Sequence, residues 1–363
     1  MGTGDGMIGK TVGDYLIEKQ LGEGGMGVVF KGVHPTLGQI VAIKMLHPNL
    51  VKADSIKQRF VREAQAMARL RHPNILQLFN FVENAEGCFI IMEFVEGKTF
   101  ESILEESGVI PPDRALELFV PMLDAMQYAH DAGIIHRDIK PSNMMLLNSG
   151  VAKMMDFGTA KVAGGSQLTA AGMTLGTVVY MSPEQLMGRD LTPAADVYSL
   201  GVTLYEMCTG RLPFYHDNEM MLMKMIMKEA PPPPSSIYPA MPKDLEKAIL
   251  KSMDKTAAKR YQSCKEFKAD LEKVKAGLGG AKPASNPQVA VPAAPPAPPS
   301  TPAQPTAPKT PTPPATPVPG ETTSAIPAPP PAPAAAPAGT HPLVFVGGGL
   351  MGLGVLAGGG LFM

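Results

Sequence analysis

The sequence lacks an excess of charge of either sign, because 32 basic and 33 acidic residues leave a formal net charge of −1. Such a balance excludes a strong overall attraction to nucleic acid or to an acidic membrane surface. Cysteine is scarce: only Cys88, Cys208 and Cys264 are present, and none forms a CxxC pair. We interpret them as reduced core thiols of a cytosolic domain, without a disulfide or metal role. Residues 1–14 are glycine-rich and contain no apolar run, which predicts a flexible N-terminus without a signal peptide.

Regions of different composition follow this N-terminus. The length of 363 residues suggests two domains, or one large domain with tails. Residues 15–275 alternate apolar runs, amphipathic stretches and turn signals, which predicts a globular domain. Residues 276–342 are rich in Pro, Ala and Thr, and their 22 prolines predict a disordered linker that buries no core. We interpret this linker as a tether, with binding of partners to its PxxP and Thr-Pro motifs as the alternative.

The final segment, residues 343–363, contains no charged residue and has the length of one membrane-spanning helix. Eight of its residues are glycines, which form helices poorly but allow close helix packing at the spacing of Gly348 and Gly352. We predict a single C-terminal transmembrane segment, with a sticky disordered tail as the alternative.

A glycine-rich motif, Gly22-Glu-Gly24-Gly-Met-Gly27, lies within residues 15–33, whose pattern predicts two strands joined by a tight loop. The same GxGxxG occurs in dinucleotide-binding folds, where a helix follows the third glycine. Here the β-branched run Val28–Val33 follows instead. We therefore favour a strand–loop–strand flap whose backbone amides cover phosphates, because glycine lets the backbone approach a ligand closely.

Lys44 ends the apolar strand that begins at Val41. Burial of an ammonium group is costly unless phosphates or a carboxylate compensate for it. A carboxylate partner is expected on the next predicted helix, residues 55–70, where Glu63 lies on the apolar stripe between Phe60 and Met67. We expect Glu63 to face inward, to pair with Lys44 and to orient it toward the α- and β-phosphates of a nucleotide.

Three further motifs follow in order: His136-Arg-Asp138-Ile-Lys140-Pro-Ser-Asn143, Asp156-Phe157-Gly158 and Ser182-Pro183-Glu184. With the glycine-rich loop and Val41–Lys44, they resemble the signatures of Hanks-type (eukaryotic-like) bacterial serine/threonine protein kinases. The resemblance covers residues 15–275. It implies an α+β, bilobal protein kinase fold with a β-rich N-lobe at about 15–95 and a helical C-lobe at about 96–275.

The resemblance also implies transfer of the γ-phosphoryl group of ATP to Ser/Thr hydroxyls of proteins, including the chain's own activation loop. Such a reaction depends on positioning and charge neutralisation. Asp138 would orient the acceptor hydroxyl and Lys140 would contact the γ-phosphate, with Lys44 and Glu63 completing the catalytic set. Asn143 and Asp156 would hold Mg²⁺, or Mn²⁺ as the alternative, through hard oxygen ligands.

The nucleotide site implied by the resemblance combines the glycine-rich loop with an adenine pocket. Met155 would join its lining, and Met92 would stand at the back of the pocket. The hinge would run from Glu93 to Val95. The residues expected to contact the nucleotide are Leu21, Gly22, Glu23, Gly24, Gly25, Met26, Gly27, Val28, Val29, Ala42, Lys44, Glu93, Val95 and Met145.

Supporting roles also follow from the resemblance. Asp196 should hold the backbone of the catalytic loop, and Arg260 should pair with Glu184. A spine joining the lobes should contain Met67, Leu78, His136 and Phe157. The methionine-rich run 220–227 is predicted to form a C-lobe helix packed into the core.

Specificity and regulation are predicted from the segment between the metal motif and Ser182-Pro-Glu. Lys140 together with Gly176-Thr177 is typical of serine/threonine kinases, and Thr177 should contact Asp138 and Lys140. Residues 159–181 correspond to an activation loop. We expect phosphorylation of Thr169 or Thr174 to order this loop through a charge-assisted pair with Arg137.

The alternatives are a pseudokinase scaffold and a small-molecule kinase. The first is disfavoured because no catalytic residue is missing, and the second because such enzymes usually lack the Gly-Thr and Pro-Glu segments. The expected partners are protein substrates, the membrane through 343–363, a second copy in a homodimer and Pro-rich-motif binders of the linker, with no nucleic acid. The expected location is the cell membrane, single-pass, with the kinase domain in the cytoplasm.

Overall fold

The computed structural model describes residues 5–24, 27–51, 53–157 and 175–278. The predicted phosphorylation sites Thr169 and Thr174, most of the linker and the predicted membrane segment lie outside these ranges. Within them, no helix is both long enough and apolar enough to span a bilayer.

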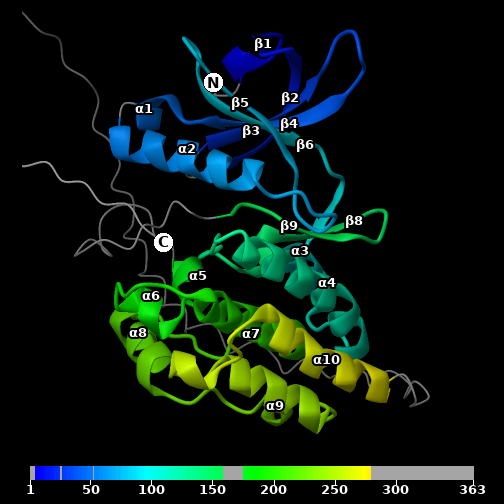
Figure 1. Cartoon of the computed structure of the whole chain (residues 1–363), viewed down its shortest axis with the longest axis vertical. Helices are drawn as coiled ribbons and strands as arrows, with labels where there is room; N and C mark the ends of the chain where they lie inside the picture. The colour runs from blue at the N-terminus through cyan, green and yellow to red at the C-terminus, as the bar shows by residue number, and fades with distance from the viewer. Residues whose placement is uncertain (1–4, 25–26, 52, 158–174, 279–363) are drawn as a thin grey trace, which may run out of the picture. The chain divides into compact units, whose positions relative to one another are not determined.

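The N-terminal part is a six-stranded antiparallel sheet with the order β1-β2-β3-β4-β6-β5 and one long helix, α2 (Figure 1). Its strands are β1 (Thr11–Val12), β2 (Tyr15–Gly24), β3 (Gly27–Val33), β4 (Ile40–Leu46), β5 (Leu78–Asn84) and β6 (Gly87–Glu93). A short turn of helix, α1 (Pro48–Val51), precedes α2 (Asp54–Ala68). Buried apolar side chains of these strands form one cluster on the sheet, built around Val28, Phe30 and Ile43. The predicted strand–loop–strand at 15–33 is thus confirmed, and no helix follows Gly27.

The second part is mainly helical. Its elements are β7 (Gly97–Thr99), α3 (Phe100–Ser107), α4 (Pro112–Asp131), β8 (Met144–Leu147), β9 (Ala152–Met154), α5 (Leu175–Val178), α6 (Pro183–Leu186), α7 (Pro193–Thr209), α8 (Glu219–Lys228), α9 (Lys243–Ser252) and α10 (Cys264–Leu278). Strands β7, β8 and β9 form a small sheet of their own. Because α10 continues to Leu278, helical structure extends past residue 275, where the domain was predicted to end.

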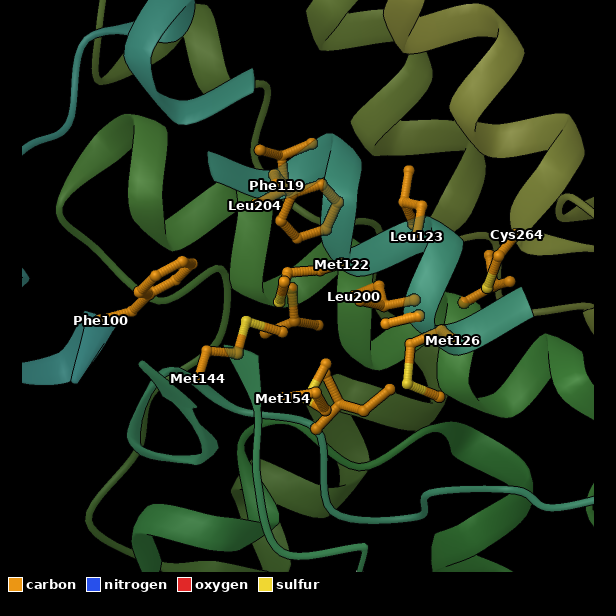
Figure 2. Close-up of a cluster of buried hydrophobic side chains, with 14 of the residues drawn as sticks. Phe100, Phe119, Met122, Leu123, Met126, Met144, Met154, Leu200, Leu204 and Cys264 are labelled. Atoms are coloured by element: carbon orange, nitrogen blue, oxygen red, sulfur yellow. The ribbon is translucent and has the colours of Figure 1, made fainter. Parts of the chain in front are cut away.

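Helix α7 lies at the centre of this helical part, and nearly all of its side chains are buried. Figure 2 shows Leu200 and Leu204 of α7 within a cluster of buried side chains that includes Phe119 and Met122 of α4. Packing against α9 is close: a Cβ atom on Gly201 would lie 2.0 Å from Oγ of Ser252. Only glycine therefore lets α7 and α9 approach this closely.

The methionine-rich run forms α8, as predicted, but the prediction that the run packs into the core is wrong for its first two residues. Met220 is 80% exposed and Met221 is 41% exposed. Leu222 and Ile226 are the fully buried residues of the helix. These two lie four residues apart on one face, and a helix that packs through one face leaves the others toward solvent.

Candidate active site

A buried lysine joins three distant segments of the chain. Nζ of Lys44 on β4 lies 3.2 Å from Oε1 of Glu63 on α2 and 2.8 Å from Oδ1 of Asp156, which follows β9. Glu63 is only 4% exposed, so its predicted inward position is confirmed. The contact between Lys44 and Asp156 was not foreseen from the sequence, because no pattern relates residues 112 positions apart.

Electrostatics favour the charged forms of Lys44 and Asp156. Burial alone would lower the pKa of Lys44, but the negative charges of Asp156 and Glu63 outweigh burial and raise it. The charge of Lys44 lowers the pKa of Asp156 below its ordinary value, although burial opposes this. Burial raises the pKa of Glu63, and Lys44 offsets part of that increase. Lys44 is thereby kept protonated, which is the form that can bind an anionic group such as a phosphate.

The side chains of Asp138, Lys140 and Asn143 lie together in the catalytic loop, as predicted. Nδ2 of Asn143 donates to the backbone carbonyl of Asp138 at 2.7 Å and to its Oδ2 atom at 3.1 Å. Nζ of Lys140 lies 3.3 Å from the same Oδ2 atom and donates to Oγ1 of Thr177 at 3.3 Å. The predicted contact of Thr177 with Lys140 is therefore present. These contacts fix the carboxylate of Asp138 between an amide and an ammonium group.

The backbone of the loop is held by Asp196 of α7, as predicted. Its Oδ2 atom accepts from the N–H of His136 at 2.8 Å, and its Oδ1 atom accepts from the N–H of Arg137 at 2.9 Å. Arg137 has a φ of +68° and Asp156 has a φ of +43°, in the left-handed region that residues other than glycine rarely adopt. These backbone angles set the direction of the chain at Arg137 and at Asp156. Such strained angles persist only where the surrounding packing holds the backbone in place.

The predicted ion pair of Arg260 and Glu184 and the predicted spine are both present. Nη1 and Nη2 of Arg260 donate to the two carboxylate oxygens of Glu184 at 2.7 and 2.9 Å. The spine residues Met67, Leu78, His136 and Phe157 are all buried. The rings of His136 and Phe157 lie 4.5 Å apart between centroids.

Only some of the residues predicted to line the adenine pocket pack together. Ala42 and Met92 are buried together, and Val29, Val95 and Met155 pack against them. Leu21 is not in this cluster. It is 42% exposed at an irregularity of β2 between Gln20 and Gly22, where the strand loses strict alternation.

The other positions named for nucleotide contact are placed as follows. Met145 is half-buried on β8, outside the same cluster. The side chain of Glu93 binds Nζ of Lys153 at 2.9 Å, so its carboxylate is already engaged at the start of the hinge. Gly24 and Gly27 pair where β2 meets β3, and a Cβ atom on Gly27 would lie 2.0 Å from the backbone oxygen of Met45. Gly25 and Met26 lie outside the described residues.

Sequence reasoning missed Leu76, which is 5% exposed and packs with Ala42 and Met92 at the back of the pocket. The signal available was weak, because Leu76 belongs to no motif and lies in a short apolar pair after His72-Pro73. Gln185 was also missed: its Nε2 atom donates to the carbonyl of Arg137 at 2.9 Å and ties α6 to the catalytic loop.

Comparison with known families shows the family to which the chain belongs. Residues 15–270 match the family model for the protein kinase domain. The chain belongs to the protein kinase family. Protein kinases as a family use ATP and a divalent metal ion.

Individual relatives agree with this protein kinase assignment. A probable serine/threonine-protein kinase of Clostridium perfringens is 38% identical over 270 residues, which cover 74% of this chain and 39% of that protein. The serine/threonine-protein kinase PknA of Mycobacterium tuberculosis is 36% identical over 298 residues, covering 80% of this chain and 68% of that protein. The crystal structure of the Mycobacterium tuberculosis PknI kinase domain superposes with a TM-score of 0.60 at 28% identity, covering 74% of this chain and 98% of that one. The chain thus spans about two fifths of the length of several curated relatives.

Proposed function

We propose that this chain is a protein serine/threonine kinase that transfers the γ-phosphoryl group of ATP to protein hydroxyls. The observation that carries the proposal is the joining of Lys44, Glu63 and Asp156 beside a loop that fixes Asp138. Removal of these charges from water costs free energy. A catalytic role explains why a buried ammonium shared between two carboxylates is present, whereas a scaffold that only binds partners does not need one.

Each side chain has one task in this proposal. Asp138 accepts a hydrogen bond from the incoming hydroxyl and orients its oxygen toward the phosphorus atom. Lys140, which lies 3.3 Å from Asp138, neutralises charge that develops on the transferred group. Lys44 binds the phosphates that remain with the nucleotide, and Glu63 keeps its ammonium in place.

The donor set fits Mg²⁺. The amide nitrogen of Asn143 is engaged by Asp138, which leaves its oxygen to face a cation. Asp156 contributes a carboxylate whose lowered pKa keeps it ionised. Both are the hard oxygen ligands that Mg²⁺ prefers. When bound, the metal neutralises phosphate charge.

The test uses the full chain with labelled ATP, Mg²⁺ and a generic basic protein as acceptor. Asp138→Asn should lower the rate of transfer by about 10²–10⁴-fold while ATP binding persists, because only the orientation of the acceptor is lost. Asp113→Asn, a change at an exposed residue in the first turn of α4, is the matched control and should keep full activity. A wild type that binds ATP but labels nothing would favour the pseudokinase scaffold. Label on a small molecule alone would favour the small-molecule kinase.

Regulation by the activation loop is part of the proposal. Arg137 follows His136 in the loop held by Asp196, so its backbone is fixed before any phosphate arrives. Phosphorylation of Thr169 or Thr174 would then supply a charge-assisted partner for its guanidinium group. Mapping of phosphosites in active protein tests this, and finding both threonines unmodified would contradict it.

We also propose a location at the cell membrane through residues 343–363, with the kinase domain in the cytoplasm. The uncharged composition and 21-residue length of the segment support this proposal. Full-length protein should sediment with membranes, and a chain ending at residue 342 should not. We propose in addition that the chain forms a homodimer, which light scattering of the detergent-solubilised protein would test. We also propose that proteins recognising Pro-rich motifs bind the linker, which a binding assay with a 276–342 peptide would test.

A further inference from the structure

A line of three buried side chains connects α10 to the catalytic loop. Sγ of Cys264, the first residue of α10, lies 3.7 Å from Nδ1 of His130 near the end of α4. Nε2 of His130 lies 2.8 Å from Oδ2 of Asp196. The same Oδ2 atom accepts from the backbone N–H of His136 at 2.8 Å. The sequence signalled only the last of these contacts.

All three side chains are shielded from solvent. Cys264 is 0% exposed and Asp196 is 1% exposed, while the His130 side chain is 3% exposed. Figure 2 shows Cys264 at the edge of a cluster of buried side chains that includes Leu123 and Met126 of α4. In such surroundings a hydrogen bond that is not made costs the full desolvation of its donor or acceptor, so the proton positions in this line matter.

The chemistry of each group assigns those protons. Burial would raise the pKa of Asp196, but the hydrogen bonds that it accepts from His130 and from the backbone of Arg137 outweigh burial and lower the pKa, so Asp196 is a carboxylate that only accepts. Nε2 of His130 therefore carries the hydrogen and donates. Burial raises the pKa of the Cys264 thiol well above its ordinary value, so Cys264 keeps its hydrogen. In a neutral imidazole the second nitrogen, Nδ1, is then the acceptor that faces the S–H group.

We propose that Cys264 and His130 are positioning residues for the catalytic loop: the thiol donates to Nδ1 and so fixes the tautomer of His130 that donates to Asp196. The carboxylate of Asp196 is thereby held against the N–H groups of His136 and Arg137, next to Asp138. This inference rests on the proposed kinase function, because its consequence is the placement of Asp138.

The kinetic test compares full-length Cys264→Ala, Cys264→Ser and Cys208→Ala. Cys264→Ala removes the donor and should lower kcat about 2- to 30-fold, with an unchanged KM for ATP because the phosphate-binding residues lie elsewhere. Cys264→Ser retains a hydrogen-bond donor and should recover most of the loss. Cys208→Ala is the matched control, since Cys208 is equally buried in α7 and its pKa is raised by burial alone. An equal loss of kcat in Cys208→Ala and Cys264→Ala would show that the loss comes from the removal of a buried side chain and not of a hydrogen-bond donor. That result would overturn the proposal.

A spectroscopic test does not depend on activity. Chemical shifts of ¹⁵N in histidine-labelled full-length protein should report a protonated Nε2 and a bare Nδ1 at His130, identified by the signals lost in His130→Gln. In Cys264→Ala the Nδ1 signal should shift, whereas Cys208→Ala should leave it in place. A protonated Nδ1 in the wild type, or an unmoved signal in Cys264→Ala, would overturn the proposal. A wild type without phosphoryl transfer would instead contradict the kinase function and leave this measurement valid.

Discussion

The ammonium group of Lys44 is shared, 2.8 Å from the carboxylate of Asp156 and 3.2 Å from that of Glu63. Two carboxylates that would repel each other are thereby held at one site by a single cation. The pair with Asp156 joins β4 to the segment after β9, so the lysine proposed to bind phosphates and the aspartate proposed to bind metal are in direct contact. Loss of the lysine should therefore affect both sides of the site.

Replacement of the shared lysine is the first prediction. Lys44→Met should lower kcat by about 10²–10³-fold, the usual effect of removing one group that stabilises developing charge. Glu63, then buried without its cation, should take up a proton because burial already raises its pKa. Lys31→Met, which breaks a surface pair between β3 and Glu18, is the control and should retain activity. Steady-state kinetics of the three proteins provide the measurement, and an active Lys44→Met would contradict the proposed role.

The pair of Glu184 and Arg260 should matter for stability. The Arg260 side chain is 0% exposed, so Glu184→Gln leaves a buried charge without its carboxylate and should cost about 3–5 kcal/mol of unfolding free energy. Glu117→Gln breaks an exposed pair with Arg114 and should cost at most about 1 kcal/mol. Urea denaturation at neutral pH measures both, and equal losses would contradict the prediction.

The same pair predicts a pH dependence. Burial opposes ionisation of Glu184, but hydrogen bonds from Arg260 outweigh it and hold its pKa below the ordinary value of 4.5. A lowered folded-state pKa gives stability that is complete above pH 4.5 and is lost as pH falls through the folded-state value. The stability difference between wild type and Glu184→Gln should therefore be largest near neutrality and shrink in acid. Denaturation midpoints across that range test the sign, and a difference that grows in acid would refute it.

Contact between α7 and α9 gives a prediction on packing. A Cβ atom at Gly201 would meet Oγ of Ser252 at 2.0 Å, so Gly201→Ala should destabilise the protein by about 1–3 kcal/mol through overpacking. Gly277 on α10 has no atom within 4 Å of the corresponding position. Gly277→Ala should therefore stabilise the helix by up to about 1 kcal/mol. Thermal denaturation of the two variants should give shifts of opposite sign.

The cluster of Ala42, Leu76 and Met92 provides a test of the predicted adenine pocket. Met92 is 6% exposed and packs with Ala42 and Leu76. Met92→Ala should cost about 2–5 kcal/mol of stability and open space beside the adenine ring. The variant should then use an ATP analogue with a bulky N6 substituent that the wild type rejects. Rejection of that analogue by a folded variant would place the adenine elsewhere.

The local elements could be predicted from the sequence, and so could the pairs of Lys44 with Glu63 and of Arg260 with Glu184, but not the pair of Lys44 with Asp156. The run from Tyr15 to Val33 shows its strands through β-branched residues, and Glu63 shows its inward position through helical periodicity. Leu76 could not be found because burial at a pocket wall leaves no periodic signal in so short a segment. The exposure of Met220 could not be predicted either, because most residues of α8 are apolar and composition alone does not show which face of the helix packs against the core. Contacts between distant segments, such as Cys264 with His130, depend on tertiary packing.

The positive φ angles of Arg137 and Asp156 have a consequence for how this chain tolerates change. Each costs on the order of 1 kcal/mol relative to a relaxed backbone. A glycine at position 156 would release that strain and would also remove the carboxylate that we propose as a metal ligand. A change that relaxes the backbone here would therefore remove the proposed metal-binding carboxylate, so stability and the proposed activity make opposite demands on residue 156.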